Sequence, residues 1–134
     1  EKIVFKSSDL ALFLKGASQV LIFGATAGQK IMDVVAQKTT AKDLTRAVVY
    51  NAVAGEMVDD ALTWLSQYCS HQIRRENFVL DTRRFSAGYG DFDIKYQKVF
   101  WEHLKLDAIG VMLTDAYCLV PEKSVTAISG IRLG

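Results

Sequence analysis

The segment Arg84-Phe85-Ser86-Ala87-Gly88-Tyr89-Gly90 combines residue types suited to holding a small anionic ligand beside an aromatic ring. The guanidinium of Arg84 is planar and permanently charged, so it can grip a carboxylate through two parallel hydrogen bonds. Glycines on both sides of Tyr89 let the backbone adopt angles closed to other residues and let a ligand approach closely. The spacing therefore predicts a binding turn in which Arg84 supplies the charge and Tyr89 the ring.

The other reactive residue types form no catalytic constellation. Cys69 and His71 lie two positions apart on a predicted helix and point to different faces, which argues against a nucleophile–base pair. His103 and Cys118 are isolated and no metal-ligand spacing occurs, so we expect no metal site. The turn Gly24–Lys30 follows a predicted strand and opens a helix, but its glycines fit neither the P-loop nor the dinucleotide pattern. A nucleotide-dependent enzyme built on this turn is kept as an alternative hypothesis.

Length and composition set the class of protein. The 134 residues are close to the commonest domain size and half are hydrophobic, so we expect one domain over residues 1–134. Sixteen basic and fifteen acidic side chains nearly cancel, which argues against a nucleic-acid partner. No apolar run approaches the ~20 residues of a membrane span, and no signal-peptide pattern opens the chain. The chain begins with Glu1 rather than methionine, which is consistent with a fragment of a longer cytoplasmic protein.

Helical periodicity predicts one long helix in the middle of the chain. From Ala41 to about Arg75 no proline occurs, and apolar residues recur at helical spacing. These residues are Leu44, Val48, Met57, Ala61, Leu65, Tyr68 and Cys69. The opposite side is also apolar, at Val49, Ala52, Val53 and Trp64. We therefore expect this helix to be buried on more than one side.

Shorter elements surround the long helix. Strands are predicted at Ile3–Phe5, Gln19–Ala25, Phe78–Leu80, Ile109–Leu113 and Ser124–Leu133, and helices at Asp9–Lys15, Gln29–Gln37 and Ile94–Leu104. Because helices and strands do not alternate regularly, this order favours an α+β fold. We expect a mixed or antiparallel twisted sheet packed with one long central helix and shorter helices.

Three motifs together resemble the activation domain of cobalamin-dependent methionine synthase. That family carries Arg-x-x-x-Gly-Tyr-Pro, then a helix, then Leu-Thr-Glu-Ser and Pro-x-x-Ser-Val-Ser-Gly. The matching segments here are Arg84–Tyr89, Leu113-Thr114-Asp115-Ala116 and Pro121-Glu122-Lys123-Ser124-Val125. The resemblance covers about Leu44 to Gly130. It departs from the family where Tyr-Pro-x-Cys-Pro is replaced by Tyr89-Gly90-Asp91-Phe92-Asp93.

The resemblance implies a protein that binds S-adenosylmethionine and supports reductive remethylation of a cobalamin held by a partner methyltransferase, with a flavoprotein as reductant. The implied S-adenosylmethionine-binding residues are Arg84, which holds the carboxylate, Ala87, Gly88 and Tyr89. The residues implied to face the cobalamin are Tyr89, Gly90 and Asp59. A sulfonium methyl donor is already activated, so such a protein needs positioning more than acid–base groups. No catalytic residue is expected.

A second functional hypothesis stays open beside this one. The chain can be a non-catalytic interaction module that docks a corrinoid protein through the turn Arg84–Phe92 without binding S-adenosylmethionine. Capture of a cobalamin-binding domain that does not depend on S-adenosylmethionine would favour the second hypothesis.

Overall fold

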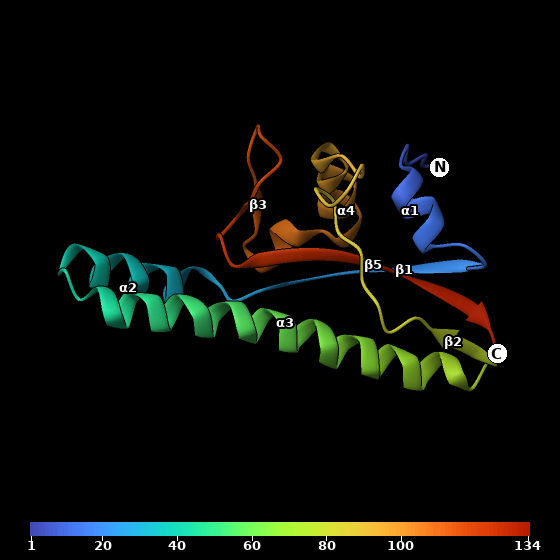
Figure 1. The fold of residues 1–134 in the computed structure, drawn as a ribbon, viewed down its shortest axis with the longest axis horizontal. Helices are drawn as coiled ribbons and strands as arrows, with labels where there is room; N and C mark the ends of the chain where they lie inside the picture. The colour runs from blue at the N-terminus through green and yellow to red at the C-terminus, as the bar shows by residue number, and fades with distance from the viewer.

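The computed structural model describes residues 1–134 as helices packed on both faces of a central sheet (Figure 1). The sheet has three antiparallel strands in the order β1-β5-β2. They are β1 (Gln19–Thr26), β5 (Ser124–Leu133) and β2 (Phe78–Leu80). The long helix α3 (Leu44–Arg74) crosses one face, and α2 (Gln29–Thr40) runs beside its first half. The predicted α+β class, with an antiparallel sheet and one long helix, is confirmed.

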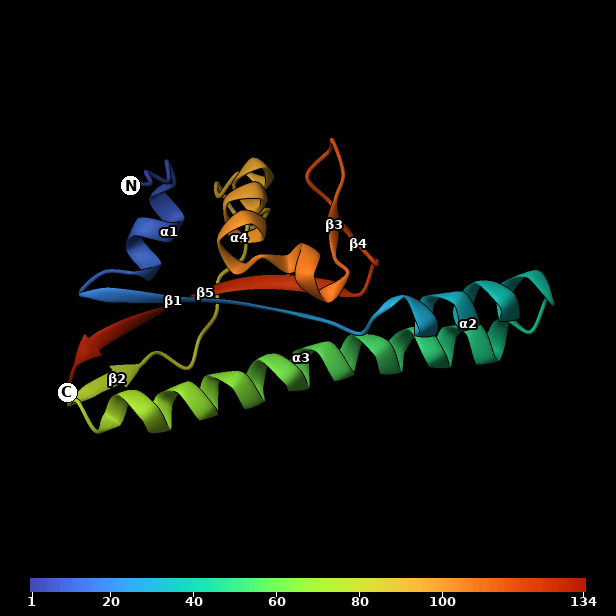
Figure 2. The same ribbon diagram turned by 180° about the vertical axis from the view of Figure 1, so that it is seen from behind.

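The opposite face of the sheet carries the shorter helices, as the view from behind also shows (Figure 2). They are α1 (Ser8–Phe13) and α4 (Gln97–Leu104), with the 3-10 turns η1 (Ile94–Tyr96) and η2 (Leu106–Ile109). A separate two-stranded ribbon pairs β3 (Met112–Leu113) with β4 (Leu119–Val120). None of the helices combines the length and apolar character needed to cross a bilayer.

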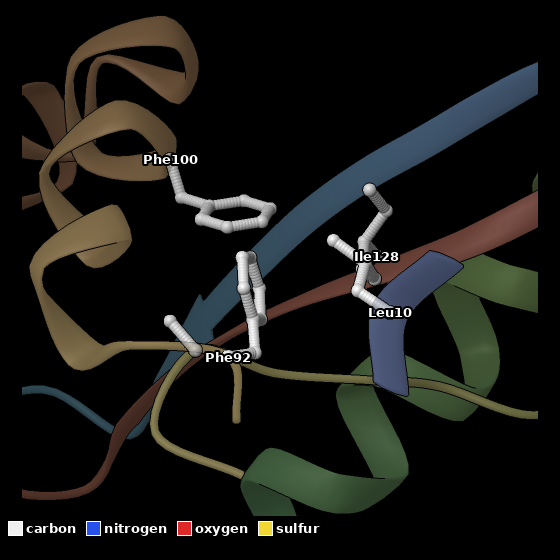
Figure 3. Packing of buried hydrophobic residues seen from close by; sticks show 5 residues of the cluster. Leu10, Phe92, Phe100 and Ile128 are labelled. Carbon is white, nitrogen blue, oxygen red and sulfur yellow. The ribbon is translucent and has the colours of Figure 1, made fainter. Parts of the chain in front are cut away.

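The central strand β5 is buried on both faces, which explains its continuous run of buried residues from Thr126 to Ile131. Successive side chains point to opposite faces of the sheet. Ala127 packs toward α3, in a cluster with Phe23 and Leu62. Ile128 points the other way, and Figure 3 shows it beside Leu10, Phe92 and Phe100. The strand therefore joins two apolar cores, one on each face of the sheet.

The side of α3 that faces the protein differs from the predicted one. The buried residues are Ala47, Ala54, Val58 and Leu62. Leu44, Val48, Met57 and Tyr68, predicted to face the core, are more than half exposed, and Val49, Val53 and Trp64 are also exposed. These residues are spaced by seven and four positions, so they form a single stripe along the helix. The expectation of burial on several sides is wrong, since a stripe of apolar side chains stays open to solvent.

Two further predictions are corrected at the ends of the chain. Ile3–Phe5 forms no strand; instead the ring of Phe5 lies against Phe92, Tyr96 and Phe100 at centroid distances of 5.4, 5.1 and 5.9 Å. The segment 109–113 is not one strand, because Gly110 has a φ of 79° and ends η2 before the two residues of β3. Cys69 and Cys118 are both free thiols.

Candidate functional site

Arg84 reaches α3 because the segment that follows β2 runs beside β5 for one more residue. The N–H of Phe85 donates to the carbonyl of Ile128 at 2.9 Å, and the N–H of Ile128 donates back at 2.8 Å. Alternation along an extended chain then sends neighbouring side chains to opposite faces. Phe85 enters the core near Phe92, whereas Arg84 turns to α3, where its Nη1 donates to Thr63 Oγ1 at 3.1 Å.

The turn that carries Tyr89 is shaped by the two glycines beside it. Gly88 and Gly90 have φ angles of 95° and 53°, in the left-handed region that L side chains rarely adopt. The turn is fixed by the Gly88 N–H, which donates to the carbonyl of Phe92 at 2.7 Å, and by the Ser86 hydroxyl, which donates to the carbonyl of Thr126 at 2.7 Å. The Tyr89 side chain makes none of the hydrogen bonds that fix the turn, and this residue is 67% exposed.

Arg84, Tyr89 and Asp59 line one hollow of about 260 Å³. Apolar residues make its base, at Leu62 of α3 and at Val125 and Ala127 of β5. Arg84 takes part in none of the ion pairs of the structure, so its charge is not neutralised by a protein carboxylate. A guanidinium with no acidic partner, beside an exposed phenol ring, can accept a small carboxylate. The hollow thus brings together the three side chains that the resemblance implied for ligand and partner contacts.

The remaining sequence-implied residues shape the turn without lining the hollow. The side chain of Ala87 is buried in the core, although its backbone N–H and C=O make no hydrogen bond within the protein. Ala87 is 7% exposed as a whole residue and lines neither hollow, so the structure does not bring it into the candidate site. Gly90 faces the start of α1, where an added Cβ would collide with the carboxylate of Asp9.

Asp91 ties the Tyr89 turn to the first turn of α1, a role that the sequence did not reveal. Its carboxylate accepts hydrogen bonds from the Ser7 hydroxyl and from the N–H groups of Ser8 and Asp9. The Asp9 carboxylate in turn accepts from the Asp91 N–H at 2.9 Å. The Ser7 hydroxyl bond, followed by the Ser8 N–H bond, holds the pKa of Asp91 below its usual range. This reciprocal clamp occupies the position where the chain departs from the family motif.

Replacing Gly90 with alanine will destabilise the protein by about 2–4 kcal/mol, because a left-handed alanine is strained and its Cβ displaces Asp9 from the clamp. The matched control is Gly110→Ala, which has a φ of 79° but no neighbour within 4 Å of the added Cβ. Gly110→Ala therefore introduces the backbone strain without the collision, and it will lower the free energy of unfolding by about 1–2 kcal/mol. Urea unfolding followed by circular dichroism measures both, and equal losses would show that the clamp contributes nothing.

A second acidic residue, Asp81, pairs with two arginines at the other end of the same segment. Its Oδ2 lies 2.7 Å from Arg83 Nη2 and 3.4 Å from Arg132 Nη1. The hydrogen bond from the Arg83 side chain is the largest cause that lowers the pKa of Asp81 to about 2. The pair ties the end of β2 to β5, on which Arg132 lies.

The free energy of unfolding will fall as the pH is lowered from about 4 to 2. Asp81 binds its proton more weakly in the folded state than in the unfolded state, so its stabilisation is complete above pH 4 to 5 and is lost as the pH falls through about 2. Asp81→Asn will cost about 1–2 kcal/mol at pH 7, since solvent screens the exposed Arg83, and will flatten this decline. Urea unfolding of the wild type and of Asp81→Asn at several pH values measures this decline. The exposed Asp107, which forms no ion pair, provides the Asp107→Asn control, and an equal decline in both variants contradicts the assignment.

Fold and hollow together define an α+β protein in which a half-buried arginine and an exposed tyrosine lie beside one long helix. No protein-family model matches the chain, and no curated protein matches it. Among solved structures, the crystal structure of the MetH reactivation domain bound to AdoHcy is similar in fold, with a TM-score of 0.68 at 18% sequence identity. The similarity covers 83% of this chain, which spans 38% of the length of that structure. The resemblance inferred from the motifs is thus confirmed for the fold.

Proposed function

We propose that this protein binds the amino-acid end of an S-adenosyl ligand in the hollow formed by Arg84, Tyr89 and Asp59, and so supports reductive remethylation of a cobalamin on a partner methyltransferase. The observation that carries the proposal is the Arg84 guanidinium, which has no acidic partner and borders a hollow beside Tyr89. The fold around it is similar to that of a reactivation domain bound to AdoHcy.

The volume of the hollow indicates which part of the S-adenosyl ligand it can hold. Pockets that enclose a whole small molecule measure about 300–1,000 Å³. At about 260 Å³, this hollow fits the amino-acid end and not the complete ligand. On this proposal Arg84 takes the carboxylate in a bidentate pair.

The chemistry assigned to this chain is positioning. A sulfonium methyl group is already activated for transfer, so the protein gains rate mainly by holding donor and acceptor in a productive geometry. Tyr89 and Asp59 are both exposed at the hollow, and on this proposal they contact the partner. The cobalamin and the flavoprotein reductant belong to other proteins on this proposal.

Calorimetric titration of S-adenosylmethionine and of S-adenosylhomocysteine into the protein tests the proposal. Saturable heat with both ligands is expected, because the amino-acid end is common to the two. No heat at millimolar ligand would overturn ligand binding.

The small volume of the hollow also supports the second function, an interaction module that docks a corrinoid protein without a ligand. Capture by an immobilised cobalamin-binding domain separates the two functions. Capture that is unchanged when S-adenosylmethionine is omitted, together with no heat in the titration, favours the interaction module.

A further inference from the structure

A second and larger hollow, of about 570 Å³, lies on the other side of Arg84. It is bounded by the C-terminal half of α3 and by the segment 80–84, and nine of its ten lining residues are polar or charged. Its volume is within the range of about 300–1,000 Å³ that is typical of small-molecule sites. A hollow of this size that is lined mainly by polar and charged residues is suited to a polar ligand.

The lining of this hollow has a positive net charge, because its acidic side chain is paired with arginines that lie outside the hollow. Its one acidic residue, Asp81, is already paired with Arg83 and Arg132, neither of which lines the hollow. Arg74 and Arg84 both line it, and neither forms an ion pair. The C-terminal end of a helix such as α3 carries a partial charge of about −0.5, which disfavours an anion. The two positive charges of the guanidiniums are larger than this partial charge. The balance favours an anionic ligand.

The arrangement of hydrogen-bond donors narrows the class of anion. Gln67, Ser70 and Arg74 approach from α3, and their side chains make no hydrogen bond within the protein. Thr82, whose hydroxyl is also unused, and Arg84 approach from the facing segment. A carboxylate offers two oxygens that one arginine satisfies, whereas a phosphate offers acceptors in several directions. Donors on opposite walls therefore match a phosphate better than a carboxylate.

We propose that this hollow binds a phosphate group, either free or esterified to a small molecule, with Arg74 and Arg84 supplying the charge and Ser70 a hydroxyl donor. The site is separate from the hollow assigned to the S-adenosyl ligand and shares only Arg84 with it. No S-adenosyl ligand enters the test, so its failure leaves the proposed function untouched, and failure of the proposed function leaves this site untouched.

Titration of the ¹⁵N-labelled protein at constant ionic strength, followed by nuclear magnetic resonance, tests the proposal. Inorganic phosphate is expected to give saturable shifts at residues 66–74 and 80–84, with a Kd of roughly 1–10 mM. Glycerol 3-phosphate distinguishes an esterified phosphate from a free one. If it binds more tightly than inorganic phosphate, the ligand of the hollow is a phosphate ester, and if it binds more weakly, the ligand is the free ion. Acetate, as the carboxylate probe, will bind at least about 5-fold more weakly than phosphate.

Arg74→Ala is expected to weaken phosphate binding about 10-fold. Arg75→Ala is the matched control, because it removes the same charge from the next residue, which does not line the hollow, and will change the Kd less than about 2-fold. Ser70→Ala provides a second variant that leaves the net charge unchanged and will weaken binding about 3-fold. Shifts that do not saturate, equal binding of acetate, or equal losses in Arg74→Ala and Arg75→Ala would each overturn the proposal.

Discussion

Phe92→Ala will destabilise the protein by about 3–5 kcal/mol, a large share of the roughly 5–15 kcal/mol that stabilises a typical domain. The Phe92 side chain is completely buried, and Figure 3 shows its ring pointing from the loop toward Phe100 of α4. Its ring lies 5.3 to 6.1 Å from four other aromatic rings, those of Phe5, Phe85, Tyr96 and Phe100. Alanine would leave a cavity that these rigid rings cannot close. Urea unfolding followed by circular dichroism measures the loss.

The control for this prediction is Leu12→Ala on α1, whose side chain is 72% exposed and which will cost less than about 0.5 kcal/mol. A loss below about 1 kcal/mol for Phe92→Ala would contradict the packing described for this core. The position also matters for the site, because the backbone carbonyl of Phe92 accepts the hydrogen bond that fixes Gly88. Loss of the ring is therefore expected to loosen the Tyr89 turn as well as the core.

Elements with a local cause were predictable from the sequence. The strands β1 and β5 and the long helix α3 each depend on patterns among neighbouring residues, so their predicted bounds agree with the structure within a few residues. The face of α3 that contacts the protein was not predictable in the same way. It is set by where the other elements pack against the helix, and Ala47 and Ala54 are too weakly hydrophobic to stand out from Leu44 and Val48 by periodicity.

In the candidate site, too, the residues that form a local pattern were predictable and those brought together by the fold were not. Residue types and spacing singled out Arg84 and Tyr89 because a charged fork and a glycine-flanked ring occur within one short segment. The Asp91 clamp was missed because its partner Ser7 lies 84 residues away, and no local pattern connects the two. The second hollow was missed for another reason: a polar stripe on a helix, such as Ser70 and Arg74, usually indicates a solvated face. Only the position of the facing segment converts that stripe into the wall of a hollow.

Arg84→Ala will weaken binding of S-adenosylmethionine about 10- to 100-fold in calorimetric titration, since it removes a bidentate, charge-assisted pair with the ligand carboxylate. Little loss of stability is expected, because the Arg84 side chain makes one hydrogen bond, to Thr63, and no ion pair. Arg84→Lys will recover only part of the affinity, because an ammonium keeps the charge but lacks the planar fork. This graded order separates a bidentate contact from general attraction, in which lysine would bind as well as arginine.

The control for this last prediction is again Arg75→Ala, which alters the net charge equally at a residue that lines neither hollow. Unchanged affinity in Arg84→Ala would remove the carboxylate contact from the proposed function, whatever the wild-type affinity. The shared position of Arg84 adds a further expectation. Since both hollows use this one guanidinium, phosphate and the S-adenosyl ligand will weaken each other's binding in the wild type by the same factor, because coupling between two binding sites is reciprocal.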